Sequence, residues 1–510
     1  MAFPYLTVAG LIPLALALLV ACSKPSVARV AGLAGSLLGL GYIGGVVAYS
    51  VTKSDPLAEK ISWLPIIGSS YQLRLDGMGL VMVAMTALLV PMVLIAEWKT
   101  GVSQRGRYSS KSFIALVLLV ESFSLFSFLS FDLLVFYVFF EATLIPMYFL
   151  IGGWSGRGRG PQATKAANKF LLFGLAGGLI MLFSLVGTAE LSSRAAGGLS
   201  LGFLDLAAQN LGNSATAKVI FLGFFIAFAL KAPMVPGHIW LPDAAEESTP
   251  GAAALMVGVL DKLGTFGMIR VCVGVFPEQS AWATPVILIL ALLSIFYGAF
   301  AAIGAKNLMR LIAYTSISHF GFMVLGIFAL TSQSISGSIF YMVNHGLATG
   351  ALYLVVGYLI ARRGSADVGD FGGVVKIAPL AAGFTLVAGL ASCALPGTSS
   401  FVSEFMVVAG TWSRHPVIAG IAVIGTVLAA IYILWTYQRM MTGPVTEATE
   451  KHITSDLNWR ERWALIPLVA AILILGFWPH PALHQIEPTA TYYMTAASAT
   501  DPVAGTEEGR

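Results

Sequence analysis

This chain of 510 residues is 57% hydrophobic and only 11% charged. Soluble globular domains have about 25% charged residues, so the composition excludes a soluble enzyme. The net charge is +4 and the basic residues are scattered between apolar segments, which argues against nucleic-acid binding. The three cysteines are far apart and form no Cys-X-X-Cys pair, so we expect no metal site.

Apolar segments recur along nearly the whole chain, each close to the about 20 residues that cross a bilayer as a helix. The sequence therefore predicts an all-α polytopic membrane protein with about fourteen transmembrane helices. Residues 192–214 and 495–510 are predicted to lie outside the membrane as a polar loop and a polar tail. The predicted spans are 4–22, 28–50, 76–97, 112–130, 132–152, 166–188, 218–235, 251–271, 283–304, 308–329, 334–361, 377–410, 415–437 and 462–479.

The basic residues favour one orientation of these spans. Most of the 29 Lys and Arg residues follow odd-numbered spans, and such loops are cytoplasmic by the positive-inside rule. Both termini are then predicted on the outer side, with Arg270 among the outer basic residues. Lys231 and Lys262 belong to neither side because they lie inside predicted spans.

Five ionisable side chains are predicted near the middle of the membrane. Glu141 lies nine residues beyond Asp132, roughly 13 Å along a helix. Lys262, His319 and His345 each lie about eleven residues into their spans, and Glu404 lies in the second half of its span. A charge at the bilayer centre costs at least about 2.5 kcal/mol, so such residues indicate function. The two histidines also have a simpler interpretation as hydrogen-bonding partners between helices.

Two spans contain helix-breaking residues. Pro233 and Pro236 follow Lys231, and Pro396-Gly397 interrupts the twelfth span; each proline removes a backbone donor. Broken helices in both halves of a chain are typical of inverted repeats around a mid-membrane ion path. We therefore expect helices 1 to 3 in residues 1–111, two five-helix repeats in 112–271 and 283–437, and the last helix with a polar tail in 438–510.

These residues together predict a proton path. A carboxylate beside a buried lysine favours its charged form, so moving the carboxylate away releases the proton. We expect Glu141 to hold Lys231 charged, and loss of this pair to move a proton to Lys262. Water, His319 and His345 would then carry it to Glu404. The possible modulators of this path are Glu121, Asp261 and His238.

Three motifs carry a family resemblance over roughly residues 75–440: Lys231-Ala-Pro-Met-Val-Pro-Gly-His-Ile-Trp-Leu-Pro-Asp243, Glu141-Ala-Thr-Leu-Ile-Pro-Met-Tyr-Phe149 and Leu395-Pro-Gly-Thr-Ser-Ser-Phe-Val-Ser-Glu-Phe405. They closely resemble the antiporter-like membrane subunits of respiratory complex I, the proton-translocating NADH:quinone oxidoreductase. The resemblance implies a carboxylate–lysine pair at Glu141 and Lys231, a central lysine at Lys262, a connecting histidine at His345 and a terminal carrier at Glu404.

The resemblance also implies a location and partners. The chain would lie in a bacterial cytoplasmic membrane, among lipids, beside L-type and N-type antiporter-like subunits and small membrane subunits. It would hold no cofactor, because FMN, the iron–sulfur clusters and the quinone belong to partner subunits. Two positions depart from the family: Ala245 stands where many relatives have histidine, and Asp261 precedes the central lysine.

Other functions stay open at this point. A cation/proton antiporter complex of the multiple-resistance type and a membrane-bound hydrogenase share the lysines and the broken helices. A haem-binding electron carrier would use His319 and His345 as axial ligands, which is a weak indication by itself. A purely structural scaffold would leave four buried charges, at Glu141, Lys231, Lys262 and Glu404, without a role.

Overall fold

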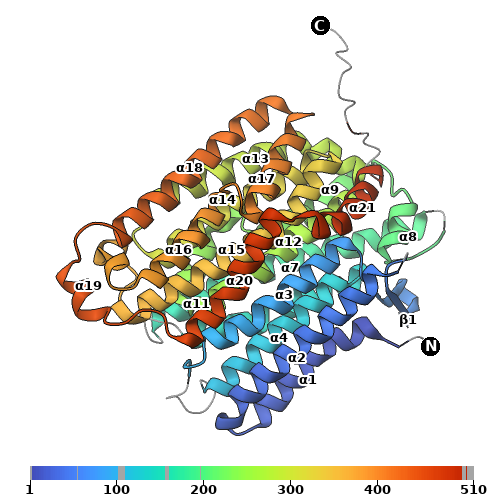
Figure 1. Cartoon of the computed structure of the whole chain (residues 1–510). Helices are drawn as coiled ribbons and strands as arrows, with labels where there is room; N and C mark the ends of the chain where they lie inside the picture. The colour runs from blue at the N-terminus through green and yellow to red at the C-terminus, as the bar shows by residue number, and fades with distance from the viewer. Residues whose placement is uncertain are drawn as a thin grey trace.

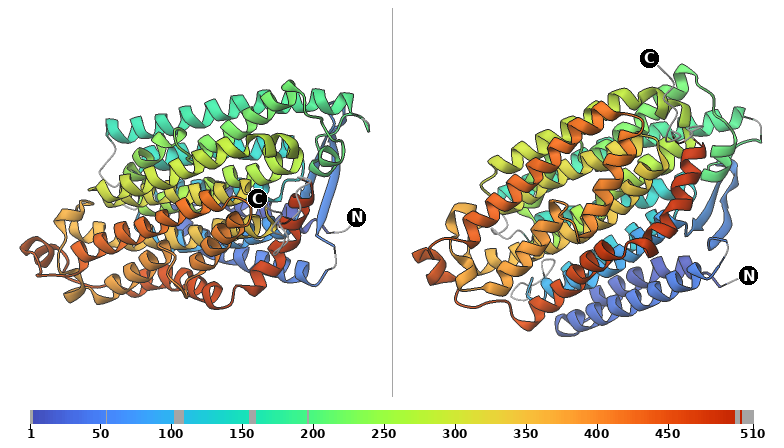
Figure 2. Two further views of the ribbon diagram at one scale, coloured as in Figure 1. Left: turned by 90° about the horizontal axis from the view of Figure 1, so that it is seen from above. Right: turned by 45° about the horizontal axis from the view of Figure 1, so that its top comes forward.

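The computed structural model describes residues 3–53, 55–101, 109–154, 160–195, 197–496 and 501. Long helices run side by side in one bundle, with α1 and α2 along one edge (Figures 1 and 2). The elements are α1 Tyr5–Cys22, α2 Pro25–Val51, β1 Ala58–Leu64, β2 Ser69–Arg74, α3 Gly77–Ala96, α4 Ser110–Leu129, α5 Leu133–Ala142, α6 Leu144–Gly153, α7 Pro161–Arg194, α8 Phe203–Ala208, α9 Ala215–Lys231, η3 Gly237–Trp240, α10 Leu241–Glu247, α11 Pro250–Leu255, η4 Met256–Leu260, α12 Lys262–Gly267, η5 Met268–Val273, α13 Pro277–Gly304, α14 Leu308–Phe328, α15 Ser332–Arg363, α16 Pro379–Ser392, α17 Ser399–Trp412, α18 Pro416–Met441, α19 Glu447–His452, α20 Trp459–Phe477 and α21 His480–Ala496.

Within these described ranges, 11 helices are long and apolar enough to cross a membrane, or 12 if α20 and α21 form one span bent by 71°. The predicted polytopic helical fold is therefore confirmed. The count of fourteen stays a prediction, because α9, α16 and α17 have only 17, 14 and 14 residues. These three helices lie where the sequence predicts the two interrupted spans.

β1 and β2 pair as a short antiparallel hairpin between α2 and α3, outside every predicted span. Two local predictions are wrong. The predicted loop at 192–214 contains the end of α7 and the whole of α8, and the predicted tail begins inside α21. These segments are short or only partly apolar, so a search for membrane-length apolar runs does not detect them. The rest of the tail lies outside the described residues, apart from Asp501.

Both interruptions lie at the expected prolines. α9 ends at Lys231, and Ala232 leaves the helical region with φ −88° and ψ 59°. α16 ends at Ser392, after which Ala394 and Gly397 have φ +53° and φ +94° before α17 begins. A missing backbone donor and a left-handed residue both stop a helix, so the polar side chains beside each break lie at helix ends.

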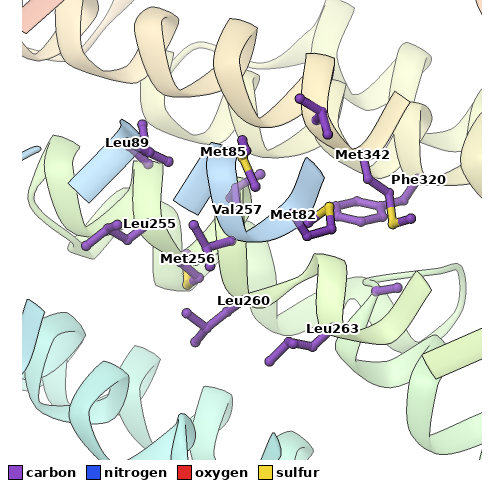
Figure 3. Packing of buried hydrophobic residues seen from close by; sticks show 14 of the residues in the cluster. Met82, Met85, Leu89, Leu255, Met256, Val257, Leu260, Leu263, Phe320 and Met342 are labelled. Carbon is purple, nitrogen blue, oxygen red and sulfur yellow. The ribbon is translucent and has the colours of Figure 1, made fainter. Parts of the chain in front are cut away.

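The span from Pro250 to Val273 lies at the centre of the molecule and is buried throughout. It contains two π-helical segments, η4 and η5, one on each side of α12. Figure 3 shows how Met82 and Met85 of α3, Phe320 of α14 and Met342 of α15 pack around this span in one apolar cluster. Lys262 is fully buried, and its ammonium group makes its hydrogen bonds with protein atoms.

Candidate functional site

A first polar group lies where α5 and α9 end. The Lys231 ammonium donates a hydrogen bond of 3.0 Å to Oγ1 of Thr143 and lies 4.8 Å from the Phe140 ring centroid. Glu141 interacts with Lys231 electrostatically, while the hydrogen bond of the ammonium group goes to Thr143. The predicted carboxylate–lysine neighbourhood therefore exists as a loose pair, and Thr143 is a partner that the sequence did not indicate.

Gly178 of α7 positions the Glu141 carboxyl group. A Cβ atom at residue 178 would overlap the carboxyl carbon and both carboxyl oxygens of Glu141. One of those oxygens, Oε1, is buried and has no hydrogen-bond partner in the described part of the chain. The carboxyl group therefore occupies the space left by the missing side chain, and its position depends on that glycine.

Asp261 connects the two lysines electrostatically. Its carboxylate is 1% exposed and interacts with both Lys231 and Lys262. Neither carboxylate oxygen has a hydrogen-bond partner among the residues that the structure describes. A buried carboxylate needs compensation, which here comes from the two ammonium groups. The sequence placed Asp261 on a different helix face from Lys262, and only the fold shows that it also interacts with Lys231.

The central lysine contacts a histidine directly. The Nζ atom of Lys262 lies 2.6 Å from Nδ1 of His345 and donates to the Val257 carbonyl at 2.5 Å. It also lies 5.1 Å from the Phe320 ring centroid. An ammonium group carries only donors, so Nδ1 of His345 accepts and its proton is on Nε2 whenever Lys262 is charged. The Nε2 atom has no partner among the described side chains.

A second hydrogen-bonded series leads to Glu404. Nδ1 of His319 lies 2.7 Å from the Tyr341 hydroxyl, which donates to Oε2 of Glu404 at 2.7 Å. The other carboxylate oxygen accepts from Thr426 at 2.5 Å. The Tyr432 hydroxyl lies 3.4 Å from Nε2 of His319. The three hydroxyl groups at Tyr341, Thr426 and Tyr432 were not identified from the sequence, because tyrosine and threonine are common in membrane helices.

The two histidines join these series. Their ring centroids lie 5.2 Å apart, and both side chains are buried. The order through the molecule is therefore Lys262, His345, His319, Tyr341 and Glu404. The sequence predicted both histidines without their order.

Two predicted modulators lie apart from this row. Glu121 of α4 is 1% exposed, and neither of its carboxylate oxygens has a partner in the described ranges. His238 lies in η3, and its ring centroid is 4.4 Å from that of Tyr297. Of the three modulators, only Asp261 interacts with the lysines.

An ion-pair cluster at the far side of the break holds α10 in place. Asp243 accepts from Lys169 of α7 and from Arg310 of α14, both at 2.8 Å. Arg310 also donates to Glu246 at 2.8 Å. Burial raises the pKa of Asp243, but the two cations outweigh it and hold that pKa below its ordinary value. The sequence does not indicate this cluster, because its members lie far apart in the chain.

Arg270, which the sequence places among the outer basic residues, is a buried side chain. It is 1% exposed, donates to Asp76 at 2.7 Å and 3.1 Å, and contacts the Tyr493 hydroxyl. Its guanidinium carbon lies 4.0 Å from the Phe131 ring centroid. A charged side chain is buried here because Asp76 and the aromatic ring replace its water contacts.

No group of three potential metal ligands occurs among the residues that the structure describes. What the arrangement provides is a row of proton donors and acceptors through buried helices.

Comparisons with known proteins point to one family. A family model described as "NADH:quinone oxidoreductase/Mrp antiporter, TM" matches residues 130–429. The chain is 44% identical to NADH-quinone oxidoreductase subunit M of Mycobacterium tuberculosis, covering 98% of this chain and 95% of that protein. It is 35% identical to NADH-ubiquinone oxidoreductase chain 4 of Arabidopsis thaliana, covering 90% of each.

Two solved structures have the same fold. A chain of respiratory complex I from Thermus thermophilus with bound NADH matches with a TM-score of 0.87 at 31% identity, covering 96% of this chain and 99% of that one. A chain of the Mrp complex from a Dietzia species matches with a TM-score of 0.85 at 21% identity, covering 98% and 100%. The second likeness concerns the fold alone.

Proposed function

Because this chain belongs to the NADH:quinone oxidoreductase/Mrp antiporter membrane family, we propose that it moves protons as a subunit M of a bacterial NADH:quinone oxidoreductase. The family expected from the three motifs is confirmed. One observation carries the proposal: a buried row of titratable groups runs from Lys262 through two histidines and Tyr341 to Glu404.

Each member of the row suits proton transfer. An imidazole accepts a proton on one nitrogen and releases one from the other, so His345 and His319 relay a proton when a water bridges their rings. The Tyr341 hydroxyl passes a proton on by accepting from His319 while donating its own to Glu404. Glu404 is then the terminal carrier of this half.

The other half of the path is proposed to begin at Glu141 and Lys231. When the carboxylate of Glu141 moves away, Lys231 loses a stabilising charge and its proton transfers toward Lys262. Asp261 interacts with both lysines, so it lowers the barrier for a positive charge that moves between them. It thereby serves as the modulator that the sequence suggested.

The broken helices support the proposed repeat layout. In that layout residues 112–271 and 283–437 form two inverted five-helix repeats, each with one interrupted helix. Lys262 belongs to the first repeat, and His319, His345 and Glu404 belong to the second. The contact between Lys262 and His345 is then the junction between the repeats.

The partners are proposed from the relatives. This chain would assemble with L-type and N-type antiporter-like subunits and small membrane subunits, surrounded by lipids, in the bacterial cytoplasmic membrane with both termini outside. FMN, iron–sulfur clusters and quinone would be bound by partner subunits, so this chain would belong to a translocase without performing redox chemistry itself.

The test is NADH-driven proton uptake by inverted membrane vesicles at matched assembly of the complex. We expect Lys262→Ala and Glu404→Gln to lower proton uptake and NADH oxidation together. Glu190→Gln is the matched control, because Glu190 is an exposed residue of α7 that pairs with Arg194, far from the row. Unchanged proton uptake in Lys262→Ala would refute the proposal. Loss of sodium–proton exchange without any change in NADH oxidation would instead indicate a cation/proton antiporter.

A further inference from the structure

The β-hairpin, the start of α3 and α21 lie at the end of the bundle that carries the N-terminus (Figure 1). Residues of these elements line a polar pocket. Its volume is about 300 Å³. Lys53, Arg74 and Arg270 line it, together with Phe131 and Tyr493. Because α3 begins at Gly77 and the central span ends at Val273, the pocket lies at the level of span ends, where lipid headgroups are found.

The pocket has an excess of positive charge. Asp76 neutralises Arg270, whereas Lys53 and Arg74 have no acidic partner within 4.0 Å in the described part of the chain. Asp55 also lines the pocket, which leaves one net positive charge. The Nε atoms of Arg74 and of the 1% exposed Arg270 are buried without a hydrogen-bond partner among described residues. Guanidinium groups that line a cationic pocket favour an anionic oxygen ligand.

An apolar groove of about 560 Å³ adjoins this pocket. Leu80 of α3 and Gln485 of α21 line both spaces, so they are contiguous. From Leu80 to Leu88 the groove follows α3 for about 12 Å toward the middle of the membrane. Its other walls are α2, α15, α20 and α21, and its lining is apolar apart from His480, His484 and Gln485.

From this juxtaposition we propose that the chain binds one phospholipid with an anionic headgroup. The phosphate lies in the pocket of Lys53, Arg74 and Arg270, and an acyl chain lies in the groove along α3. An acyl chain is already in an apolar environment in the bilayer, so the groove by itself gives little selectivity. The basic pocket supplies the selectivity, as a basic site at a membrane surface attracts anionic lipid.

The experiment uses the purified, assembled complex and two photoactivatable lipids with a diazirine in the acyl chain. One probe is anionic phosphatidylglycerol and the other is zwitterionic phosphatidylcholine with the same chains. Cross-linked peptides are mapped by mass spectrometry. The variant is Lys53→Gln/Arg74→Gln. The matched control is Lys60→Gln/Arg194→Gln, which removes two exposed cations at the same end without altering the pocket lining.

We expect the phosphatidylglycerol probe to label α3 and α21, and the pocket variant to lower this labelling about tenfold, the effect of one lost charge-assisted contact. The control variant should keep the wild-type labelling by phosphatidylglycerol, and the phosphatidylcholine probe sets the background. Equal labelling by both lipids, or unchanged labelling in the pocket variant, would overturn the proposal. So would displacement by inorganic phosphate, which would indicate a site for free anions. Absence of labelling because another subunit covers α3 and α21 in the complex would also overturn it.

Discussion

The Tyr341 hydroxyl donates a hydrogen bond of 2.7 Å to Oε2 of Glu404, and the oxygen of this hydroxyl lies 2.7 Å from Nδ1 of His319. One tyrosine therefore joins a histidine and a carboxylate on three different helices, α14, α15 and α17. This connection turns separate buried ionisable groups into a row.

The first prediction concerns that hydroxyl. Tyr341→Phe removes it and leaves the ring, so we expect NADH-driven proton uptake to fall about tenfold, as for one lost hydrogen bond to a charged group. Tyr358→Phe is the control, because Tyr358 lies on the same helix and its buried hydroxyl has no partner among the described residues. Equal effects of both substitutions would contradict a role in proton transfer.

The second prediction concerns Gly178. Gly178→Ala inserts a methyl group where the Glu141 carboxyl group lies, and this flexible carboxyl group shifts more readily than the helix backbone. We expect proton uptake to fall while assembly of the complex is unchanged. Gly41→Ala is a suitable comparison, since a Cβ at that helical glycine meets no atom within 4 Å. If Gly178→Ala pumps normally, the position of Glu141 does not limit the rate.

The third prediction concerns Asp261. Asp261→Asn keeps the size of the side chain and removes the charge that interacts with Lys231 and Lys262. We expect slower proton uptake with Asn and partial recovery with Asp261→Glu, because the longer carboxylate restores the charge with altered geometry. Measurements at equal amounts of assembled complex separate this effect from misfolding. Full activity of the asparagine variant would show that the charge is not needed.

The fourth prediction is a pH dependence. The folded-state pKa of Asp243 is below its ordinary value, so its ion pairs stabilise the fold above about pH 4, and that stability is lost as pH falls through the folded pKa. We expect Asp243→Asn to lower the unfolding temperature at pH 7. The loss in the free energy of unfolding should be on the order of 1 kcal/mol, because water partly screens the cluster. Thermal unfolding of the full chain at several pH values measures this difference, which should disappear in acid. If the difference in unfolding temperature between wild type and Asp243→Asn instead grew in acid, the ion pairs of Asp243 would not be its source.

The fifth prediction concerns the buried Arg270. Arg270→Met leaves Asp76 without its cation, which should cost about 3 to 5 kcal/mol in the free energy of unfolding. The double variant Arg270→Met/Asp76→Asn should recover part of that loss, because no unpaired charge remains. Denaturant titration measures the free energy of unfolding of both variants. If the double variant were no more stable than Arg270→Met, the ion pair would contribute no coupling energy.

The sequence by itself determined the membrane class, the two interrupted helices and the ionisable residues near the middle of the membrane, among them Lys262, His345 and Glu404. Hydropathy over about 20 residues, the backbone effects of proline, and the cost of a charge in lipid are local properties, which is why these features can be predicted from sequence. The β-hairpin and α8 give no such signal.

The tertiary structure decided which of these residues meet. The order of His345 and His319, the bridging Tyr341 and the position of Asp261 near both lysines depend on how α12, α14, α15 and α17 pack. Arg270 shows the same limit: only the fold brings Asp76 and Tyr493 to it, from residues 194 and 223 positions away. Contacts between distant segments depend on helix packing, which hydropathy and spacing along the chain do not encode.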